Sequence, residues 1–261
     1  AKAEDYEQIA VVGSRAAPRS VADSAVPIDI ISDEEFKQQG ATDMVSMMQT
    51  VVPSFNVNDQ PINDASTLVR PANLRGMASD HTLVLVNGKR RHRSAVITFL
   101  GGGLSDGAQG PDISVIPAAA LKQVEVLRDG AAAQYGSDAI AGVINFVLND
   151  ASEGGSFEAR YGSYYEGDGD MIQLSGNVGL PLSEKGFINL SAEYRTADDT
   201  SRSIQRDDAA ALIAAGNTFV ADPAQIWGSP EIKHDIKLFA NAGVELSDTS
   251  EAYIFGNFAE R

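Results

Sequence analysis

The sequence contains no cysteine, which excludes disulfide bonds, thiol catalysis and thiolate metal sites. Basic residues are also few: 20 Lys and Arg stand against 36 Asp and Glu, which gives a formal net charge of −16 at pH 7. Nucleic-acid binding needs a basic surface, so the sequence disfavours that class of function. The three histidines, His81, His92 and His234, are too widely spaced to indicate a zinc site. We therefore expect no metal, no cofactor and no nucleic-acid partner.

Long hydrophobic runs are missing as well. The longest, at residues 113–121 and 209–216, are shorter than the ~20 residues that a membrane-spanning helix needs. The glycine-rich segment at 99–112 lacks the Lys-Ser/Thr ending of a phosphate-binding loop. Neither a Ser–His–Asp arrangement nor a pair of catalytic carboxylates stands out, so we expect no enzymatic activity and no catalytic residues.

Residues 20–150 are typical of one small domain that mixes helices and strands. The segment 26–32 predicts a strand, and Ser32 with Glu35 forms the pattern of a capping box at the start of a helix. Apolar residues at 44–48 predict a second short helix. Asn87-Gly88 is a strong hairpin signal, and 116–127 predicts a short helix that leads into a strand.

After Asn149 the pattern changes to strict alternation of apolar and polar residues, which is typical of strands with two different faces. Four segments show it, and 251–261 begins a fifth strand whose inward face the pattern does not assign. Short turns alternate with a long connection, 196–230, that contains a predicted helix near 206–216. These features fit strands of an outer-membrane barrel, but a soluble β-sandwich with one hydrated face predicts the same alternation.

The segment 116–149, IPAAALKQVEVLRDGAAAQYGSDAIAGVINFVLN, closely resembles the signature of the plug domain of TonB-dependent outer-membrane transporters. NLRGM at 73–77 and TLVLVNGKRRH at 82–92 resemble two further plug motifs, in the order of that family. EQIAVVGSR at 7–15 resembles the TonB box that precedes the plug. DPAQIWGSPEIKHDIKLFANAGVEL, at 222–246, is similar to an early barrel segment of the same family.

The resemblance implies an α+β plug domain followed by antiparallel strands of a transmembrane β-barrel. Residues 1–19 would form a periplasmic arm with the TonB box, 20–150 the plug, and 151–261 the first strands of the barrel. Such barrels have about 22 strands, whereas the alternation here supplies about five, so we expect the chain to be a fragment.

The resemblance also implies the function and the location. We expect a receptor in the outer membrane of a Gram-negative bacterium that takes up a scarce ligand with energy from TonB. Iron chelates, cobalamin and oligosaccharides are the ligand classes, and the membrane lipid is a further partner. The TonB box, in the periplasm, would pair its main chain with TonB through Glu7, Gln8, Ile9, Ala10, Val11 and Val12.

The plug motifs are expected to be architectural: their glycines permit turns and close backbone approach, and Arg128 and Asp129 form polar contacts. They comprise Arg75, Gly76, Asn87, Gly88, Arg128, Asp129, Gly130, Tyr135, Gly136, Asp138, Gly142 and Asn145.

The basic run KRRHR at 89–93 has two interpretations. It could capture an anionic ligand, or it could contact acids on the barrel wall such as Glu158, Glu193 and Glu245; we favour the second. The candidate ligand contacts are Arg91, His92, Arg93, Gln109 and Asp112. The acidic segment 166–170 predicts either a calcium loop or, preferably, a solvated turn.

The alternative to transport is a soluble ligand-binding or adhesive β-rich module. That hypothesis requires the apolar faces of the strands after residue 156 to pack against one another and not against lipid.

Overall fold

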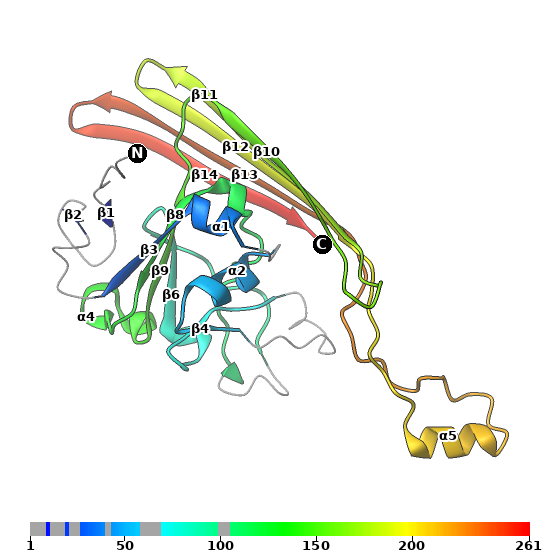
Figure 1. Cartoon of the computed structure of the whole chain (residues 1–261). Coiled ribbons are helices and arrows are strands. Elements are labelled where there is room, and N and C mark those ends of the chain that lie inside the picture. Colours follow the sequence, from blue (N-terminus) through cyan, green and yellow to red (C-terminus); the bar gives the residue numbers. More distant parts are fainter. Residues whose placement is uncertain (1–8, 11–18, 21–26, 40–42, 58–68, 99–104) are drawn as a thin grey trace, which may run out of the picture.

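The computed structural model describes residues 9–10, 19–20, 27–39, 43–57, 69–98 and 105–261. Two bodies make up this part of the chain (Figure 1). The first, called here the N-terminal domain, comprises the described residues from 27 to 150. The second is a five-stranded antiparallel sheet, called here the long sheet, and the N-terminal domain lies against one of its faces.

The N-terminal domain is built on a five-stranded sheet of order β3-β8-β9-β6-β7. β6 and β9 are parallel, and the other neighbours are antiparallel. The expected hairpin at Asn87-Gly88 joins β6 to β7. The strands are β3 (Ile28–Ser32), β6 (Thr82–Val86), β7 (Lys89–Arg90), β8 (Leu121–Leu127) and β9 (Gly142–Leu148).

Both expected helices are present. α1 (Asp33–Lys37) begins at the predicted capping box, in which Ser32 and Glu35 bond each other's backbone N–H. α2 (Met44–Val51) buries Met44, Met47 and Met48 in the main hydrophobic core. The predicted helix near residue 117 is only a three-residue 3₁₀ turn, because the chain joins the sheet at Leu121. The remaining elements are β4 (Phe55–Asn56), β5 (Asn73–Leu74), η2 (Ser79–His81), η4 (Ala118–Ala120), α4 (Ala132–Tyr135) and η5 (Ser137–Ala139).

The long sheet is a meander in which each strand pairs with the next along the chain. Its strands are β10 (Gly155–Gly162), β11 (Met171–Ser183), β12 (Gly186–Ala197), β13 (Ile232–Ser247) and β14 (Ser250–Glu260). Short turns lie at one end, and the long connection with α5 (Asp207–Ala214) extends from the other (Figure 1). The predicted strands, the long connection and its helix are thus confirmed.

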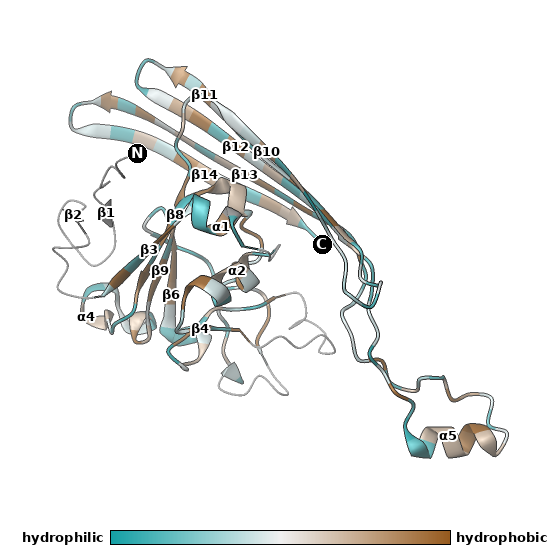
Figure 2. Cartoon of the chain, viewed as in Figure 1, coloured by the Kyte–Doolittle hydropathy of each residue, from teal (hydrophilic) through white to brown (hydrophobic). Residues whose placement is uncertain are grey.

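The two faces of the long sheet differ in polarity, and hydropathy alternates along its strands (Figure 2). Polar residues face the N-terminal domain and are buried, whereas large apolar residues on the other face are exposed. These include Ile172, Leu174, Val178, Leu180, Leu190, Leu238, Ile254 and Phe258. The register also assigns β14: Asn257 lies opposite Phe239 on the inner face, and Phe258 lies opposite Leu238 on the outer face. No helix of the described residues is long and apolar enough to cross a membrane.

Candidate functional site between the N-terminal domain and the long sheet

The inner face of the long sheet is polar yet buried. Its side chains are at most 6% exposed at Gln173, Asn189, Ser191, Glu193, Asp235, Lys237 and Asn241. Buried polar groups need hydrogen-bond partners, and several of these bond the backbone that lies across the interface or leads into the sheet. Asn241 Nδ2 lies 3.0 Å from the Asn149 carbonyl, Asn189 Nδ2 3.3 Å from that of Ala151, and Ser191 Oγ 3.5 Å from that of Ala119.

Four charged residues form a cluster on this inner face. Lys237 Nζ lies 2.5 Å from Glu193 Oε1 and 3.7 Å from Asp235 Oδ2. Arg261 Nη2 lies 2.9 Å from Asp235 Oδ2, and its Nη1 donates over 3.3 Å to Ser114 Oγ of the N-terminal domain. Two cations therefore stand against two carboxylates, which offsets the cost of burying each charge.

Phe239 is an apolar exception on the polar face. It is 4% exposed and belongs to the hydrophobic core of the N-terminal domain, and Phe255 on β14 packs against the same core. Sequence reasoning missed both residues because it read these strands only for their alternation. The detectable signal at Phe239 is an aromatic residue between Leu238 and Ala240, at a position where the alternation of the strand calls for a polar one.

The basic run at 89–93 contacts the long sheet, which is the wall of the interface, as expected. Its partners there are not the expected acids. Arg91 Nη1 donates to Asn257 Oδ1 over 2.9 Å, and Lys89 Nζ lies 5.5 Å from the centre of the Tyr253 ring. Of those acids, Glu158 pairs with Arg160 and Glu193 with Lys237. The remaining acid, Glu245, is exposed. An amide and an aromatic face replace carboxylates at these two contacts.

The candidate ligand residues are only partly brought together. Arg91, Arg93 and Gln109 line one small cavity of about 50 Å³, whereas His92 and Asp112 do not line it. Asp112 instead accepts hydrogen bonds from the backbone and hydroxyl of Ser114. Burial lowers the pKa of Arg91, and the charge of Asp112 opposes this effect. The cavity is far below the ~300 Å³ of an ordinary small-molecule pocket, so a ligand role for this group stays a prediction.

The plug motifs meet in two groups. In the first, Asn145 accepts from the Gly88 N–H and donates to the buried Glu125, while Asn87 Oδ1 accepts from the Leu148 N–H, which fixes the hairpin turn. In the second, Arg90 pairs with Asp138 and donates to the Tyr135 carbonyl. The other motif contacts are Arg128 to Asp29, Arg75 to the Ala141 carbonyl, and Asp129 to the Gly130 N–H.

The motif glycines have different reasons to be glycine. Gly142 has φ +147°, and a Cβ there would lie 2.2 Å from the Leu127 carbonyl oxygen. Gly136 has φ +96° at the end of α4, in the region that favours glycine. Gly130 shows neither feature, since a Cβ would meet only an ordinary contact at 3.5 Å. The expectation of a special backbone role is therefore wrong for Gly130.

Of the predicted TonB box, only two residues are described. Ile9 and Ala10 form β1 (Ile9–Ala10), which pairs with β2 (Arg19–Ser20). Glu7, Gln8, Val11 and Val12 lie outside the described residues. The assignment of this segment to TonB binding stays a prediction.

The acidic segment 166–170 lies beside Arg202 from the long connection. Arg202 pairs with Asp168 and, over 3.4 Å, with Glu166; its guanidinium carbon lies 5.8 Å from the centre of the Tyr164 ring. The hydrogen bond between Arg202 and Asp168 lowers the pKa of Asp168 and raises the pKa of Arg202. Within the described part of the chain, no cluster of His, Asp or Glu could hold a metal ion.

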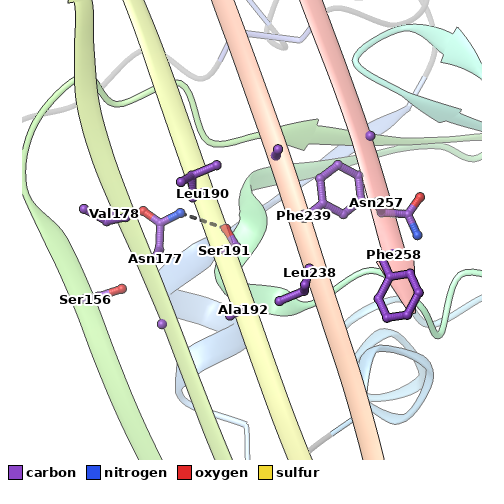
Figure 3. A pocket seen from close by; sticks show the side chains of 13 residues that line it. Ser156, Asn177, Val178, Leu190, Ser191, Ala192, Leu238, Phe239, Asn257 and Phe258 are labelled. Atoms are coloured by element: carbon purple, nitrogen blue, oxygen red, sulfur yellow. Dashed lines mark hydrogen bonds between the residues drawn. The ribbon is translucent and has the colours of Figure 1, made fainter. Parts of the chain in front are cut away.

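A shallow groove of about 590 Å³ involves mainly the apolar face of the long sheet (Figure 3). Small residues, Gly176, Ala192, Ala240 and Gly256, form its floor, because their side chains leave space between larger neighbours. Leu190, Leu238 and Phe258 flank this floor (Figure 3). No titratable side chain lines the groove, so it offers apolar contact without acid–base chemistry.

Comparison with known proteins identifies the family. Residues 20–143 match the family model of the TonB-dependent receptor plug domain. This part of the chain is a TonB-dependent receptor plug domain. The N-terminal domain is thus the plug, and the long sheet corresponds to strands of the receptor's barrel, as the sequence motifs predicted; the strands described here do not close into a barrel.

Relatives and solved structures agree with this assignment. The vitamin B12 transporter BtuB of Vibrio vulnificus is 33% identical over 52% of this chain and 19% of its own length. The ferric enterobactin receptor of Pseudomonas aeruginosa is 26% identical over 60% of this chain and 21% of its own. A crystal structure of a variant of that receptor aligns with a TM-score of 0.64 and 20% identity, over 90% of this chain and 33% of its own. The crystal structure of the siderophore receptor PirA of Acinetobacter baumannii aligns with a TM-score of 0.61 and 20% identity, over 91% of this chain and 32% of its own. This chain therefore spans a third or less of these receptors.

Proposed function

We propose that this chain is the N-terminal part of an outer-membrane receptor that takes up a scarce ligand with energy supplied through TonB. The observation that carries the proposal is the two-faced long sheet. Its polar face is buried against the plug, and its apolar face has no protein partner among the described residues. A sheet with this polarity suits a wall between lipid and a filled lumen.

The alternative of a soluble module requires the apolar face to be covered by protein. Within the described chain, Leu190, Leu238, Ile254 and Phe258 are between 41% and 73% exposed, while Phe239 on the other face is buried. A soluble monomer rarely exposes so continuous an apolar surface. This observation favours the membrane receptor, which lies in the outer membrane with residues 1–19 toward the periplasm. We assign it no catalytic role.

TonB is the proposed energy-coupling partner. It would add a strand to residues 7–12, where pairing depends on main-chain N–H and C=O groups more than on side chains. The ligand class is an iron chelate, cobalamin or an oligosaccharide. The names of the relatives favour the first two, since they are receptors for vitamin B12 and ferric enterobactin.

Uptake by the complete receptor tests the proposal. The receptor is expressed in cells that lack their own receptors for both ligands, with and without TonB, and accumulation of labelled cyanocobalamin and ferric enterobactin is measured. The Ile9→Pro variant removes a main-chain donor from the TonB box and should abolish uptake while retaining ligand binding. Ile9→Ala, which keeps the donor, is the matched control. Uptake that persists without TonB would refute the energy coupling.

A further inference from the structure

The interface between the plug and the long sheet is not uniform. On the β13–β14 side it is closely packed and apolar, whereas on the β10–β12 side it contains a cavity of about 300 Å³. The free energy needed to separate the plug from the long sheet therefore differs between the two sides.

The β13–β14 side acts as an anchor. Phe239 lies inside the plug's core, and Phe255 packs against it. Two short hydrogen bonds lie beside them: Arg91 to Asn257 at 2.9 Å and Asn241 to the Asn149 carbonyl at 3.0 Å. Separation here exposes aromatic rings to water and leaves buried polar groups without partners, both of which are unfavourable.

The cavity on the β10–β12 side is called here the gap. On the plug side the cavity is lined mainly by apolar residues of α1, α2, η4 and the start of β8: Phe36, Met47, Ala118, Ala119 and Leu121, with Asp33 and Asn149. On the side of the long sheet it is lined by Phe157 and by polar residues: Ser156, Glu158, Arg160, Gln173, Ser175 and Glu193. Two hydrogen bonds cross on this side, with Ser191 Oγ 3.5 Å from the Ala119 carbonyl and Arg160 Nη1 3.2 Å from that of Gln39. Surfaces that are already separated by a cavity lose fewer contacts when they move apart than a closely packed core does.

We propose that the ligand passes the plug along the β10–β12 side while the plug stays attached to β13–β14 through Phe239. The inference rests on the proposed uptake function. The cavity is at the lower limit of small-molecule sites, so the gap must widen during transport. Its lining combines apolar plug residues with carboxylates, an amide, hydroxyls and one guanidinium of the long sheet, which suits a solute that carries both apolar and polar groups.

These 261 residues contain no cysteine, so thiol labelling gives a direct test once any cysteine elsewhere in the complete receptor is replaced by serine. Gln173 lines the gap and Asn241 belongs to the anchor, and both are wall residues with nearly equal exposure, 4% and 5%. Single-cysteine variants of the complete receptor, Gln173→Cys and Asn241→Cys, are treated with a small maleimide in cells with and without TonB, in the presence of cyanocobalamin and ferric enterobactin. We expect labelling of the Gln173→Cys variant to rise at least tenfold with TonB, and that of Asn241→Cys to remain unchanged.

Disulfide locks provide the second measurement. The pair Ala119→Cys/Ser191→Cys ties the plug to the long sheet across the gap, and Asn149→Cys/Asn241→Cys ties β13 of the anchor to Asn149, which borders the gap. Oxidation should reduce uptake of the two labelled ligands at least tenfold for the first pair, with recovery on reduction, and leave it unchanged for the second.

The outcomes separate the two proposals. Equal labelling of both single variants, or a block of uptake by the anchor lock, overturns the passage while the uptake function stands. Absence of TonB-dependent uptake of both labelled ligands in the reduced, unlocked receptor overturns the uptake of vitamin B12 and ferric enterobactin, and the passage of these ligands with it.

Discussion

Lys237 and Glu193 lie opposite each other on β13 and β12, with Nζ 2.5 Å from Oε1 and both side chains almost completely buried. A buried ion pair contributes little net stability, because desolvation opposes the attraction, but removing one partner leaves an uncompensated charge. The pair therefore fixes the position of these two side chains on the inner face of the long sheet more than it adds to the stability of the fold.

The first prediction concerns this pair. Lys237→Met should lower the free energy of unfolding by about 3–5 kcal/mol, because Glu193 remains buried without its cation. The double variant Lys237→Met/Glu193→Leu should be more stable than this single variant, since no unpaired charge is left at that site. Chemical denaturation of the complete receptor in detergent measures both. A double variant as unstable as the sum of the two singles would contradict the prediction.

The second prediction concerns the anchor of the plug. Phe239→Ala should destabilise the receptor by about 3–5 kcal/mol, because it leaves a cavity in the plug core. Phe258→Ala is the matched control: Phe258 is 54% exposed on the outer face, in the adjacent pair of the same ladder. Thermal unfolding of the two variants should differ clearly. Equal losses would show that Phe239 does not join the wall to the plug core.

Much of this architecture could be predicted from local sequence signals. The capping box at Ser32 and Glu35, the Asn87-Gly88 turn and the alternation after residue 156 each depend on a few neighbouring residues, so they can be read without the fold. The three plug motifs point to the family for the same reason.

The contacts across the interface could not be predicted in this way. Arg91 bonds Asn257, which lies 166 positions away, and an uncharged amide gives no signal that an arginine needs it. Charge alone points to Glu158 and Glu193 as partners, but local ion pairs with Arg160 and Lys237 hold these two acids. Cross-domain contacts depend on the docking geometry, which alternation does not encode.

The third prediction concerns the motif glycines. Gly142→Ala should cost roughly 3 kcal/mol or more, because its positive φ and the nearby Leu127 carbonyl both oppose a Cβ. Gly130→Ala should change stability by less than about 1 kcal/mol, since it has neither constraint. Thermal melting of the complete receptor compares the two. A large loss in Gly130→Ala would indicate a contact that the described structure does not contain.

The last prediction concerns pH and Asp43, the N-cap of α2. Burial opposes its ionisation, but hydrogen bonds from Ser46 and the charges of Arg70 and Arg195 hold its pKa below the usual value. A carboxyl whose pKa is lower in the folded state stabilises the fold above its unfolded pKa of about 3.9, and this contribution is lost as the pH falls through the folded pKa. The stability advantage of the native receptor over Asp43→Asn, which keeps a capping oxygen, should therefore shrink as the pH falls from about 6 to 3.

A matched variant separates this local effect from general acid destabilisation. Asp106→Asn removes an exposed carboxylate of the plug and changes the net charge equally. Thermal midpoints of the native receptor and the two variants are compared across the same pH range, because general protonation lowers all three alike. Only the difference between the native receptor and Asp43→Asn should change with pH. If that difference stays constant from pH 6 to 3, the stabilisation by Asp43 does not depend on its charge, and the cap acts through its oxygen alone.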